Sequence, residues 1–385
     1  MSIHPNVSEI VKLITSEIKT LQDKKEMWAT FKRKNASLFK SLLQLEHTTL
    51  ANPGELIGFD IDESRCLMLL NYTGSAHNIL HEIEGGWSEP LRHMRGLVYD
   101  FSKEEPTLVS RGFEKFFNYN ELPENSYNEL SEKYGDQKFC AREKADGHMI
   151  EYYIHDDELC SSTRGKFGTA SAAIASNMLS LSDFHQVEKT LGVRLMSLVV
   201  ELVHPDTKVF VDYDNAEMLY LLNAYDSDGE QLSLGDLEYI CESMPHLFTC
   251  PESREMTLRE VVGEVNSRSV SNHEGWVVNF NGELIKFKYI NYIGEMVKSK
   301  LSYKYIMNCI ISDRLDKMLF TLPEELRKCA YDMVRDINNI ADCSSDYKPL
   351  YSLYSDLEGG ENYFRTVCRN FWRTVCQQSK KLSMT

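Results

Sequence analysis

The sequence has 385 residues, of which 26% are charged and 42% are hydrophobic, and its formal net charge is −16. This length allows two or three domains with a sizeable core. The negative charge argues against a protein that coats nucleic acid by bulk electrostatics, so any such contact is expected on one face and with strong salt dependence.

The cysteines and the apolar residues further limit the class of protein. The ten cysteines are scattered and form no C-x-x-C pair, which argues against a zinc site and a dense disulfide framework. The N-terminus has neither a basic region nor an apolar run, and no later stretch is long and apolar enough to span a bilayer. We therefore expect a cytoplasmic protein with reduced thiols and no membrane partner.

The first part of the chain is expected to be helical. Apolar residues recur at helical spacing between residues 6 and 45. From residue 58 onward the pattern changes to short runs of β character, such as 66–72 and 97–100. We place a domain boundary near residue 50 and expect residues 1–50 to form an N-terminal helical segment.

Two basic residues stand out in the next part of the chain. Arg95 and Gly96 lie at the start of an expected strand, which suits a guanidinium that reaches toward phosphate oxygens. Lys115 lies within an aromatic cluster, residues 113–119. Core packing explains the phenylalanines, but a lysine among aromatic residues must either reach solvent or find an anion.

The sequence pattern K-x-D-G, formed by Lys144, Asp146 and Gly147, lies between two strand-like runs. A lysine amine attacks phosphorus only when it is unprotonated, so it needs desolvation or further cations nearby. Apart from Arg142, the local sequence contains no such cation. Because Gly147 lets a phosphate approach the backbone, the pattern suits a nucleophile, although an ordinary surface lysine on a solvated hairpin remains the alternative.

Two later segments offer partners for this lysine. Arg164 follows an expected return strand and opens a turn with Gly165, and Lys166 follows closely, so that both cations could face the amine. Glu201 follows the apolar run 195–200 and reads as the end of a buried strand. A buried carboxylate must bond a hydroxyl, a metal or an arginine, and a purely structural ion pair would also satisfy it.

A hairpin is expected near residue 280. Glu274 precedes its first strand, and the dipeptide Asn281-Gly282 is a strong turn signal. Lys286 and Lys288 project from one face of the second strand because side chains alternate along a strand. The two lysines and the glutamate form a candidate cradle for a triphosphate and a metal, although a K-x-K strand is also common on solvent-facing sheets.

The remainder of the chain, from about residue 294, is expected to be helical. Its last helix, 363–373, mixes aromatic residues with arginines, as an amphipathic core helix does. Lys298, Lys300 and Lys304 follow the last strand and could extend a phosphate-binding surface.

In their order and spacing, these residues resemble the motifs of covalent nucleotidyltransferases. The upstream elements, Arg95-Gly96 and Lys115-Phe116-Phe117-Asn118, are similar to those of ATP-dependent RNA ligases of the phage tRNA-repair type. The resemblance covers about residues 65 to 290. It implies an α+β fold, with an adenylyltransferase domain of antiparallel sheets and flanking helices at 51–293 and an all-helical domain at 294–385 that helps to select the RNA.

By this resemblance, the chain is expected to join RNA 5′-phosphate and 3′-hydroxyl ends with ATP. Lys144 would form lysyl-AMP, the AMP would pass to the RNA 5′-phosphate, and the 3′-hydroxyl would displace it. Asp146 and Gly147 would shape the turn beside the nucleophile, and Glu274 would hold Mg²⁺ or Mn²⁺. The nucleotide-binding residues would be Arg95, Lys115, Arg164, Glu201, Lys286 and Lys288. Val200 stands where some relatives carry an aromatic residue, so the pattern identifies no side chain that stacks on adenine.

The partners and the alternatives follow from the same resemblance. The substrate would be broken RNA, such as nicked tRNA, with an end-healing kinase or phosphatase as a possible partner and a host cytosol as the location if the source is viral. A DNA ligase or an mRNA capping guanylyltransferase shares the lysine chemistry, but the tail lacks a recognisable OB-type β domain. A catalytically inactive RNA-binding relative would have no need of the intact nucleophile.

Overall fold

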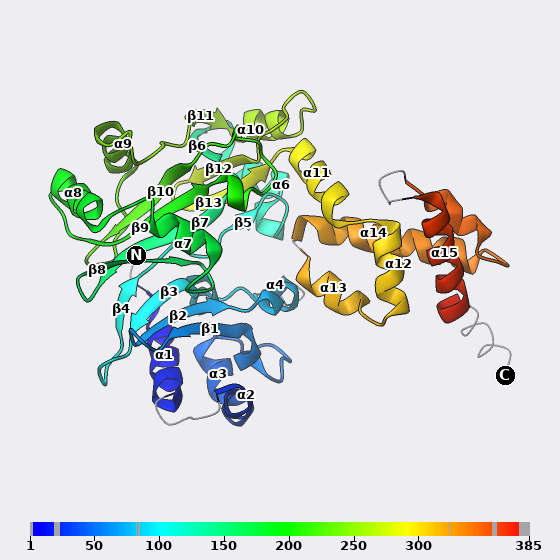
Figure 1. The fold of residues 1–385 in the computed structure, drawn as a ribbon, viewed down its shortest axis with the longest axis horizontal. Helices are drawn as coiled ribbons and strands as arrows, with labels where there is room; N and C mark the ends of the chain where they lie inside the picture. Colours follow the sequence, from blue (N-terminus) through cyan, green and yellow to red (C-terminus); the bar gives the residue numbers. More distant parts are fainter. Residues whose placement is uncertain are drawn as a thin grey trace. The chain divides into compact units, whose positions relative to one another are not determined.

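The computed structural model describes residues 3–18, 24–81, 83, 85–322, 324–355 and 360–376. The chain divides into two compact units, Met1–Tyr289 and Ile290–Thr385. Within the described residues, the first unit contains every β-strand and the second contains only helices (Figure 1).

The N-terminal helices share one hydrophobic core with the first sheet. Three helices replace the single helical run that the sequence suggested: α1 (Pro5–Ile18), α2 (Lys24–Lys34) and α3 (Ala36–Leu42). Val7 and Ile10 of α1 and Phe39 of α3 are buried in the same cluster as Met68 and Leu97 of the sheet. Burying each such side chain contributes about 2 kcal/mol. Residues 1–50, which we expected to form a segment of their own, therefore lie within the first unit.

The first sheet has four antiparallel strands in the order β1-β2-β3-β4. A short 3₁₀ turn, η1 (Pro53–Leu56), leads into it, and two short helices connect β2 to β3. The bounds of these elements are β1 (Ile57–Asp62), β2 (Leu67–Tyr72), α4 (Gly74–His81), α5 (Glu89–His93), β3 (Arg95–Asp100) and β4 (Thr107–Ser110).

The second and third sheets form the rest of the first unit. The second sheet has the order β10-β9-β7-β8, and the third has the order β11-β6-β12-β13-β5. Every pairing is antiparallel except that between β13 and β5, which is parallel. The strands are β5 (Phe117–Asn118), β6 (Lys138–Lys144), β7 (His148–His155), β8 (Glu158–Thr163), β9 (Leu195–Val203), β10 (Met218–Asp226), β11 (Ser253–Thr257), β12 (Gly275–Phe280) and β13 (Glu283–Lys288).

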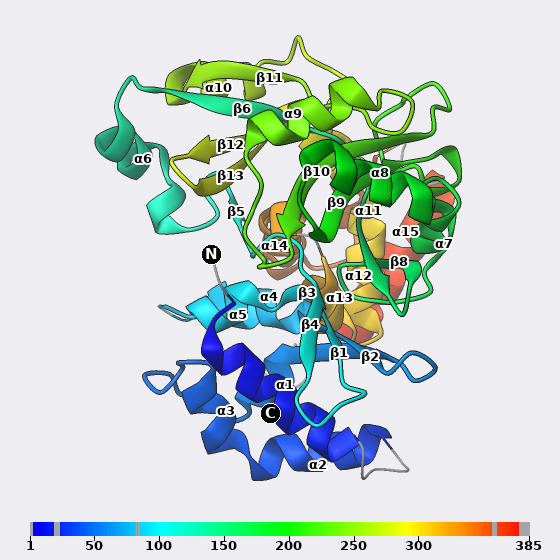
Figure 2. The same cartoon turned by 90° about the vertical axis from the view of Figure 1, so that its left-hand side faces the viewer.

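Helices cover the outer face of the second sheet (Figure 2). Phe184 and Leu237, from two of these helices, are buried against Leu198 and Leu221 of the sheet. Capping boxes begin α8, α9 and α10, in which a Ser or Thr side chain and an acidic residue satisfy free backbone amides. The connecting elements are η2 (Pro123–Asn125), α6 (Tyr127–Tyr134), α7 (Ala170–Ser176), α8 (Leu181–Leu191), η3 (Pro205–Thr207), α9 (Leu234–Ser243) and α10 (Leu258–Val265).

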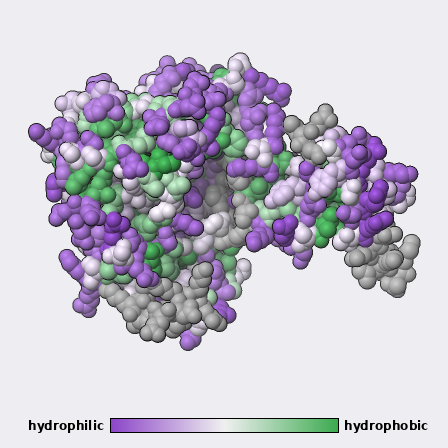
Figure 3. Space-filling view, viewed as in Figure 1, coloured by the Kyte–Doolittle hydropathy of each residue, from purple (hydrophilic) through white to green (hydrophobic). Residues whose placement is uncertain are grey.

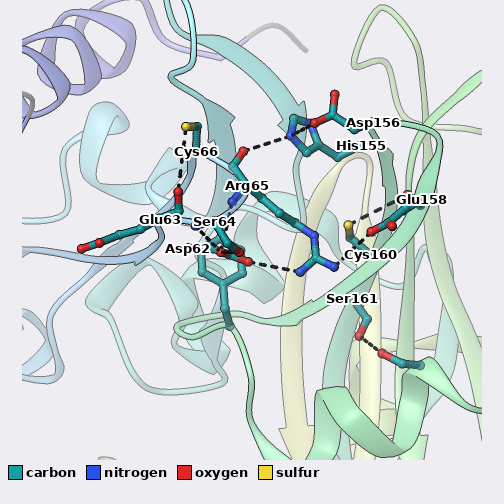
Figure 4. A network of polar contacts seen from close by, with 12 residues as sticks. Asp62, Glu63, Ser64, Arg65, Cys66, His155, Asp156, Glu158, Cys160 and Ser161 are labelled. Carbon is teal, nitrogen blue, oxygen red and sulfur yellow. Dashed lines mark hydrogen bonds and ion pairs between the residues drawn. The ribbon is translucent and has the colours of Figure 1, made fainter.

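A surface network ties the first sheet to the second (Figure 4). Arg65, in the turn after β1, donates to the carboxylates of Asp62 at 3.2 Å and Glu158 at 3.1 Å. His155 Nε2 lies 3.1 Å from the Arg65 carbonyl oxygen. Because these groups are solvated, each ion pair contributes at most about 1 kcal/mol. The network therefore links the two turns but adds little to the free energy of unfolding.

The K-x-D-G pattern lies where the chain passes from the third sheet to the second. Lys144 ends β6 and pairs with Gly275 at the start of β12. His148 begins β7, which pairs with β9 beside Glu201. The pattern is therefore a crossover between two sheets, not a hairpin turn. Three elements far apart in the sequence meet at this crossover.

The second unit is helical throughout its described residues. Its core contains Ile306, Met307, Phe364 and Phe371. Polar side chains cover much of the molecular surface, with apolar patches between them (Figure 3). The helices are α11 (Ile290–Lys300), α12 (Tyr303–Ile311), α13 (Leu315–Thr321), α14 (Glu324–Asp342), η4 (Lys348–Leu353), α15 (Glu361–Phe371) and the π-helical η6 (Trp372–Cys376).

The structure confirms the expected fold class. The first unit is an α+β assembly of largely antiparallel sheets with flanking helices, and the C-terminal part is helical. None of the helices in the described part of the chain combines the length and the apolar character that crossing a bilayer requires.

Candidate active site

An ion-paired triad lies at the crossover between the sheets. Lys144 Nζ lies 2.7 Å from Glu274 Oε2, and Lys288 Nζ lies 3.3 Å from Glu274 Oε1. Glu274 is only 5% exposed, whereas Lys144 is 20% exposed. One buried carboxylate thus holds two amines, and the more exposed of them is the predicted nucleophile.

Glu201 and the K-x-D-G turn enclose the triad from the second sheet. Burial raises the pKa of the Glu201 carboxyl to about 7, while the Lys144 charge opposes the shift and the Glu274 charge adds to it. A Cβ on Gly147 would lie 2.2 Å from the Leu202 carbonyl oxygen, so only glycine fits at this point. This close approach brings the turn against β9, and with it Lys144 close to Glu201.

Asp146 acts on the backbone of its own turn and of the next loop. Its Oδ2 accepts hydrogen bonds from the amides of Phe210 at 2.8 Å and Val211 at 2.7 Å. Its own amide donates to the Tyr213 hydroxyl at 2.9 Å. Such charge-assisted bonds fix loop geometry, so Asp146 joins the turn that follows the nucleophile to the loop at residues 210–213.

A second group of cations lies beside the triad. Burial lowers the pKa of Lys286 well below its usual range, and the charges of Lys115, Arg95 and Lys144 add to the effect. Lys286 Nζ lies 4.4 Å from the centre of the Phe116 ring, and the Arg95 guanidinium lies 5.8 Å from the same ring. Lys115 and Lys144 have carboxylate partners of their own, Glu121 and Glu274, and such a cluster of cations suits a polyphosphate.

Arg164 is oriented by an aromatic side chain. Its guanidinium donates to the Tyr72 hydroxyl at 3.1 Å and lies 5.3 Å from the centre of the Tyr72 ring. The charges of Arg164 and Arg95 repel each other across this ring. Of the ten residues predicted from the sequence, six lie at the crossover, namely Lys144, Asp146, Gly147, Glu201, Glu274 and Lys288. Lys115, Arg95 and Lys286 form the neighbouring group of cations, and Arg164 lies near Arg95.

The sequence interpretation missed the reason for Gly96, which is the buried carboxyl group of Glu151. Gly96 has φ of +80°, and a Cβ there would lie 2.3 Å from Glu151 Oε1. A Cβ on Gly112 would lie 2.5 Å from the same oxygen. Glu151 Oε2 accepts a hydrogen bond from the Ser110 hydroxyl at 2.9 Å, and burial raises the pKa of Glu151 to about 8. A glycine beside an arginine in the sequence can therefore make room for a buried carboxyl group as well as for a phosphate.

Glu151 makes stability depend on pH in a defined direction. Between its usual value of 4.5 and about 8 the folded chain holds a proton that the unfolded chain releases, so stability falls as the pH rises. We expect Glu151→Gln to remove this dependence, with a difference of about 5 kcal/mol at most by pH 9. Urea denaturation of both proteins at a series of pH values tests this. If the free energies of unfolding of the two proteins change with pH in parallel, Glu151 is ionised in the folded protein.

A pocket of about 450 Å³ lies between the second and third sheets. Arg142, two residues before the nucleophile, lines it and donates to the carbonyl oxygens of Leu222 at 2.8 Å and Leu221 at 3.0 Å. Leu222 and Val277 contribute apolar walls from the two sheets. The sequence hinted at Arg142 only as a cation two residues from Lys144.

The donor set suits a metal that is shared with a nucleotide. Among the described residues no group of three or more His, Cys, Asp and Glu side chains is arranged to hold a metal ion. Glu274 and Glu201 supply two carboxylates, and Mg²⁺ typically binds one or two carboxylates together with substrate phosphates. A metal therefore fits this site only when the phosphates complete its coordination.

The chain is similar to several known proteins over part of its length. A protein of Thermovibrio ammonificans is 27% identical over 192 residues, which are 49% of this chain and 48% of that protein. RNA ligase 1 of bacteriophage TS2126 is 26% identical over 205 residues, 51% of this chain and 50% of that protein. The solved structure of an archaeal ATP-dependent RNA ligase, form 1, aligns with a TM-score of 0.45 and 14% identity, covering 84% of this chain and 74% of that one.

The extent of these matches differs from that of the family model. The chain spans about half the length of the curated relatives it matches. The family model described as RNA ligase matches residues 93–304, which are more than half of the chain and hold every predicted site residue. The chain therefore belongs to the RNA ligase family.

Proposed function

We propose that this protein is an ATP-dependent RNA ligase that joins 5′-phosphate and 3′-hydroxyl ends through lysyl-AMP and RNA-adenylate. The observation that carries the proposal is the placement of the Lys144 amine, partly exposed and 2.7 Å from Glu274, beside the cations Lys286, Lys115 and Arg95. A structural lysine would not need several further cations around it.

In the first step, the Lys144 nitrogen attacks the α-phosphorus of ATP. A nitrogen–phosphorus bond forms, the bond to the bridging oxygen breaks, pyrophosphate leaves and the amine gives up a proton. Lys286 and Arg95 are placed to neutralise the charge that develops on the phosphate oxygens. Positioning and charge account for most of the catalysis in such transfers, so the cations have the main catalytic role.

Glu274 has two tasks in this proposal. In the free protein it holds Lys144 and Lys288 by ion pairs, and a protonated, paired amine is not nucleophilic. In the loaded protein it would hold a divalent metal, Mg²⁺ or Mn²⁺, together with the phosphates. The chemistry supplied by the metal would be charge neutralisation on the phosphates. If Glu274 held the metal, it would no longer pair with Lys144, and the amine would be free to attack.

The pocket beside Arg142 is the proposed base site. Its apolar walls at Leu222 and Val277 suit the two faces of a planar base, and its volume of about 450 Å³ suits a nucleoside. Asn279 lies in the same lining and offers an amide for the base edge. This would provide the adenine contact that the sequence did not identify.

The RNA and its other partners follow from the reaction. Sealing requires a 5′-phosphate and a 3′-hydroxyl, so ends left by a nuclease in another chemical state need a kinase or phosphatase to heal them first. Broken tRNA is one such substrate. We place the protein in the cytoplasm, of a host cell if its source is viral, where such RNA and ATP are available.

The test is labelling with α-³²P nucleotide and metal, followed by denaturing electrophoresis and peptide mapping. We expect label from ATP on the peptide that holds Lys144, and then sealing of single-stranded RNA. Label from GTP alone would place the protein with capping enzymes, and sealing of nicked DNA in preference to RNA would make it a DNA ligase. No label at all would leave an RNA-binding relative.

The second unit is the proposed site of RNA selection. Basic residues outnumber acidic ones in residues 290–385, whereas acidic residues are in large excess in residues 1–289. Only the second unit therefore lacks a strong net repulsion of RNA. We expect a chain that ends at Tyr289 to keep AMP labelling within about tenfold but to lose most RNA sealing. Equal sealing by both chains in a rate assay would contradict this role.

A further inference from the structure

Lys115 is buried in a way that demands a counter-charge. Its side chain is only 4% exposed, and its ammonium lies 4.1 Å from the centre of the Phe117 ring and 5.4 Å from that of Trp87. Ring faces attract a cation but do not replace its hydration. The anion that does so is Glu121, whose Oε1 lies 3.1 Å from Lys115 Nζ.

The Glu121 carboxylate is itself held at both oxygens. Oε1 also lies 3.1 Å from His81 Nε2 of α4, and Oε2 accepts from the Asn118 amide at 2.5 Å and from Asn118 Nδ2 at 2.7 Å. The side chain is 1% exposed. None of the steps proposed above uses Glu121, although both of its carboxylate oxygens are bonded and it contacts a site lysine.

These bonds connect Lys115 to the strand that holds Lys286. Asn118 belongs to β5 and is paired with Lys286 across the parallel β5–β13 contact. The Tyr119 amide donates to the Lys286 carbonyl at 2.8 Å. A single carboxylate therefore bonds the Lys115 ammonium on one side and the backbone next to Lys286 on the other. Moving it would change the distance between the two amines.

We propose that Glu121 is a positioning residue, which fixes Lys115 against β13 so that Lys115 and Lys286 face the nucleotide phosphates together. The assignment rests on the proposed ligase function and adds a residue to it. An opposite role is also testable, because a carboxylate that merely competes with phosphate for Lys115 would weaken nucleotide binding. Removing its charge would then strengthen binding instead of impairing it.

The experiment measures lysyl-AMP formation and the binding of a non-hydrolysable ATP analogue in the full chain. Glu121→Gln keeps the shape and an acceptor for Asn118 but removes the charge. We expect its kcat/KM for lysyl-AMP formation to fall at least about tenfold and its analogue affinity to fall as well. Glu121→Asp, which keeps the charge on a shorter side chain, should recover part of the loss.

A double-mutant cycle separates positioning from a general structural role. If Glu121 acts through Lys115, Glu121→Gln should cost almost nothing further in a Lys115→Met background. Fully additive losses, or tighter analogue binding by Glu121→Gln, would overturn the assignment. Glu114→Gln is the matched control, since this nearby carboxylate contacts His93 and Arg111 instead of a site lysine, and it should retain wild-type rates.

The outcomes also distinguish this assignment from the proposed function. If ATP labels the wild type and Glu121→Gln equally, the proposed role of Glu121 is wrong but the ligase function stands. A wild-type protein that neither forms lysyl-AMP nor binds the analogue overturns the ligase function and this assignment with it. A thermal melting midpoint for Glu121→Gln close to that of the wild type shows that any loss of rate is not a loss of folded protein.

Discussion

Lys144→Ala is expected to abolish lysyl-AMP formation, with a rate at least about 1,000-fold below that of the wild type. The amine of Lys144 is the proposed attacking group, and alanine offers no other nucleophile at this point of β6. Lys144→Arg is expected to be equally inactive, because a guanidinium keeps the charge beside Glu274 but is always protonated. The measurement is transfer of label from α-³²P ATP to protein on a denaturing gel.

Two controls sharpen this result. Lys138→Ala changes an exposed lysine at the start of the same strand and should leave labelling unchanged. Lys144→Ala should still seal RNA that already carries a 5′-adenylate, because the last step needs no lysine nucleophile. Label on the alanine variant, mapped to any other residue, would show that the nucleophile has been misassigned.

Glu274→Gln is expected to reduce lysyl-AMP formation at least about 100-fold. Glu274 contacts both Lys144 and Lys288, and its proposed second task is to hold the metal with the phosphates. An amide keeps the shape but is a poorer metal ligand. The measurement is the rate of labelling as a function of Mg²⁺ concentration.

The dependence of the labelling rate on Mg²⁺ distinguishes the two tasks proposed for Glu274, metal binding and ion pairing. If Glu274 binds the metal, the variant should need far more Mg²⁺ and recover part of its rate there. A rate that stays low and unchanged at every Mg²⁺ concentration, with a lowered melting midpoint, would instead assign Glu274 to the ion pairs alone. Glu283→Gln is the control, since this carboxylate lies on the same hairpin but pairs with Lys133.

Local sequence signals were informative wherever the structure is itself local. The Asn281-Gly282 turn predicted the hairpin of β12 and β13, and alternation along β13 placed Lys286 and Lys288 on one face. The helical spacing after residue 294 predicted the helical second unit. Turns and faces depend on residues a few positions apart, so they can be read directly from the sequence.

Contacts between elements that are far apart in the sequence could not be predicted in this way. Lys144 and Glu274 are 130 residues apart, and nothing in either segment specifies that they form an ion pair in the free protein. The K-x-D-G turn resembled a hairpin, although its two strands belong to different sheets. The register of a long-range pairing is set by which faces are buried, and burial is a property of the whole fold.

The sequence by itself determined the order of the motif residues, the hairpin strand that holds Lys286 and Lys288, and the helical character of the C-terminal part. Only the tertiary structure decided that Gly96 accommodates Glu151, that Glu121 holds Lys115, and that Arg142 bridges β6 to β10. These three are buried polar groups, and a buried polar group must find its partner wherever packing brings one within hydrogen-bonding distance. The chemical properties of a residue can be read from its identity, but its partner depends on which residues the fold brings close to it.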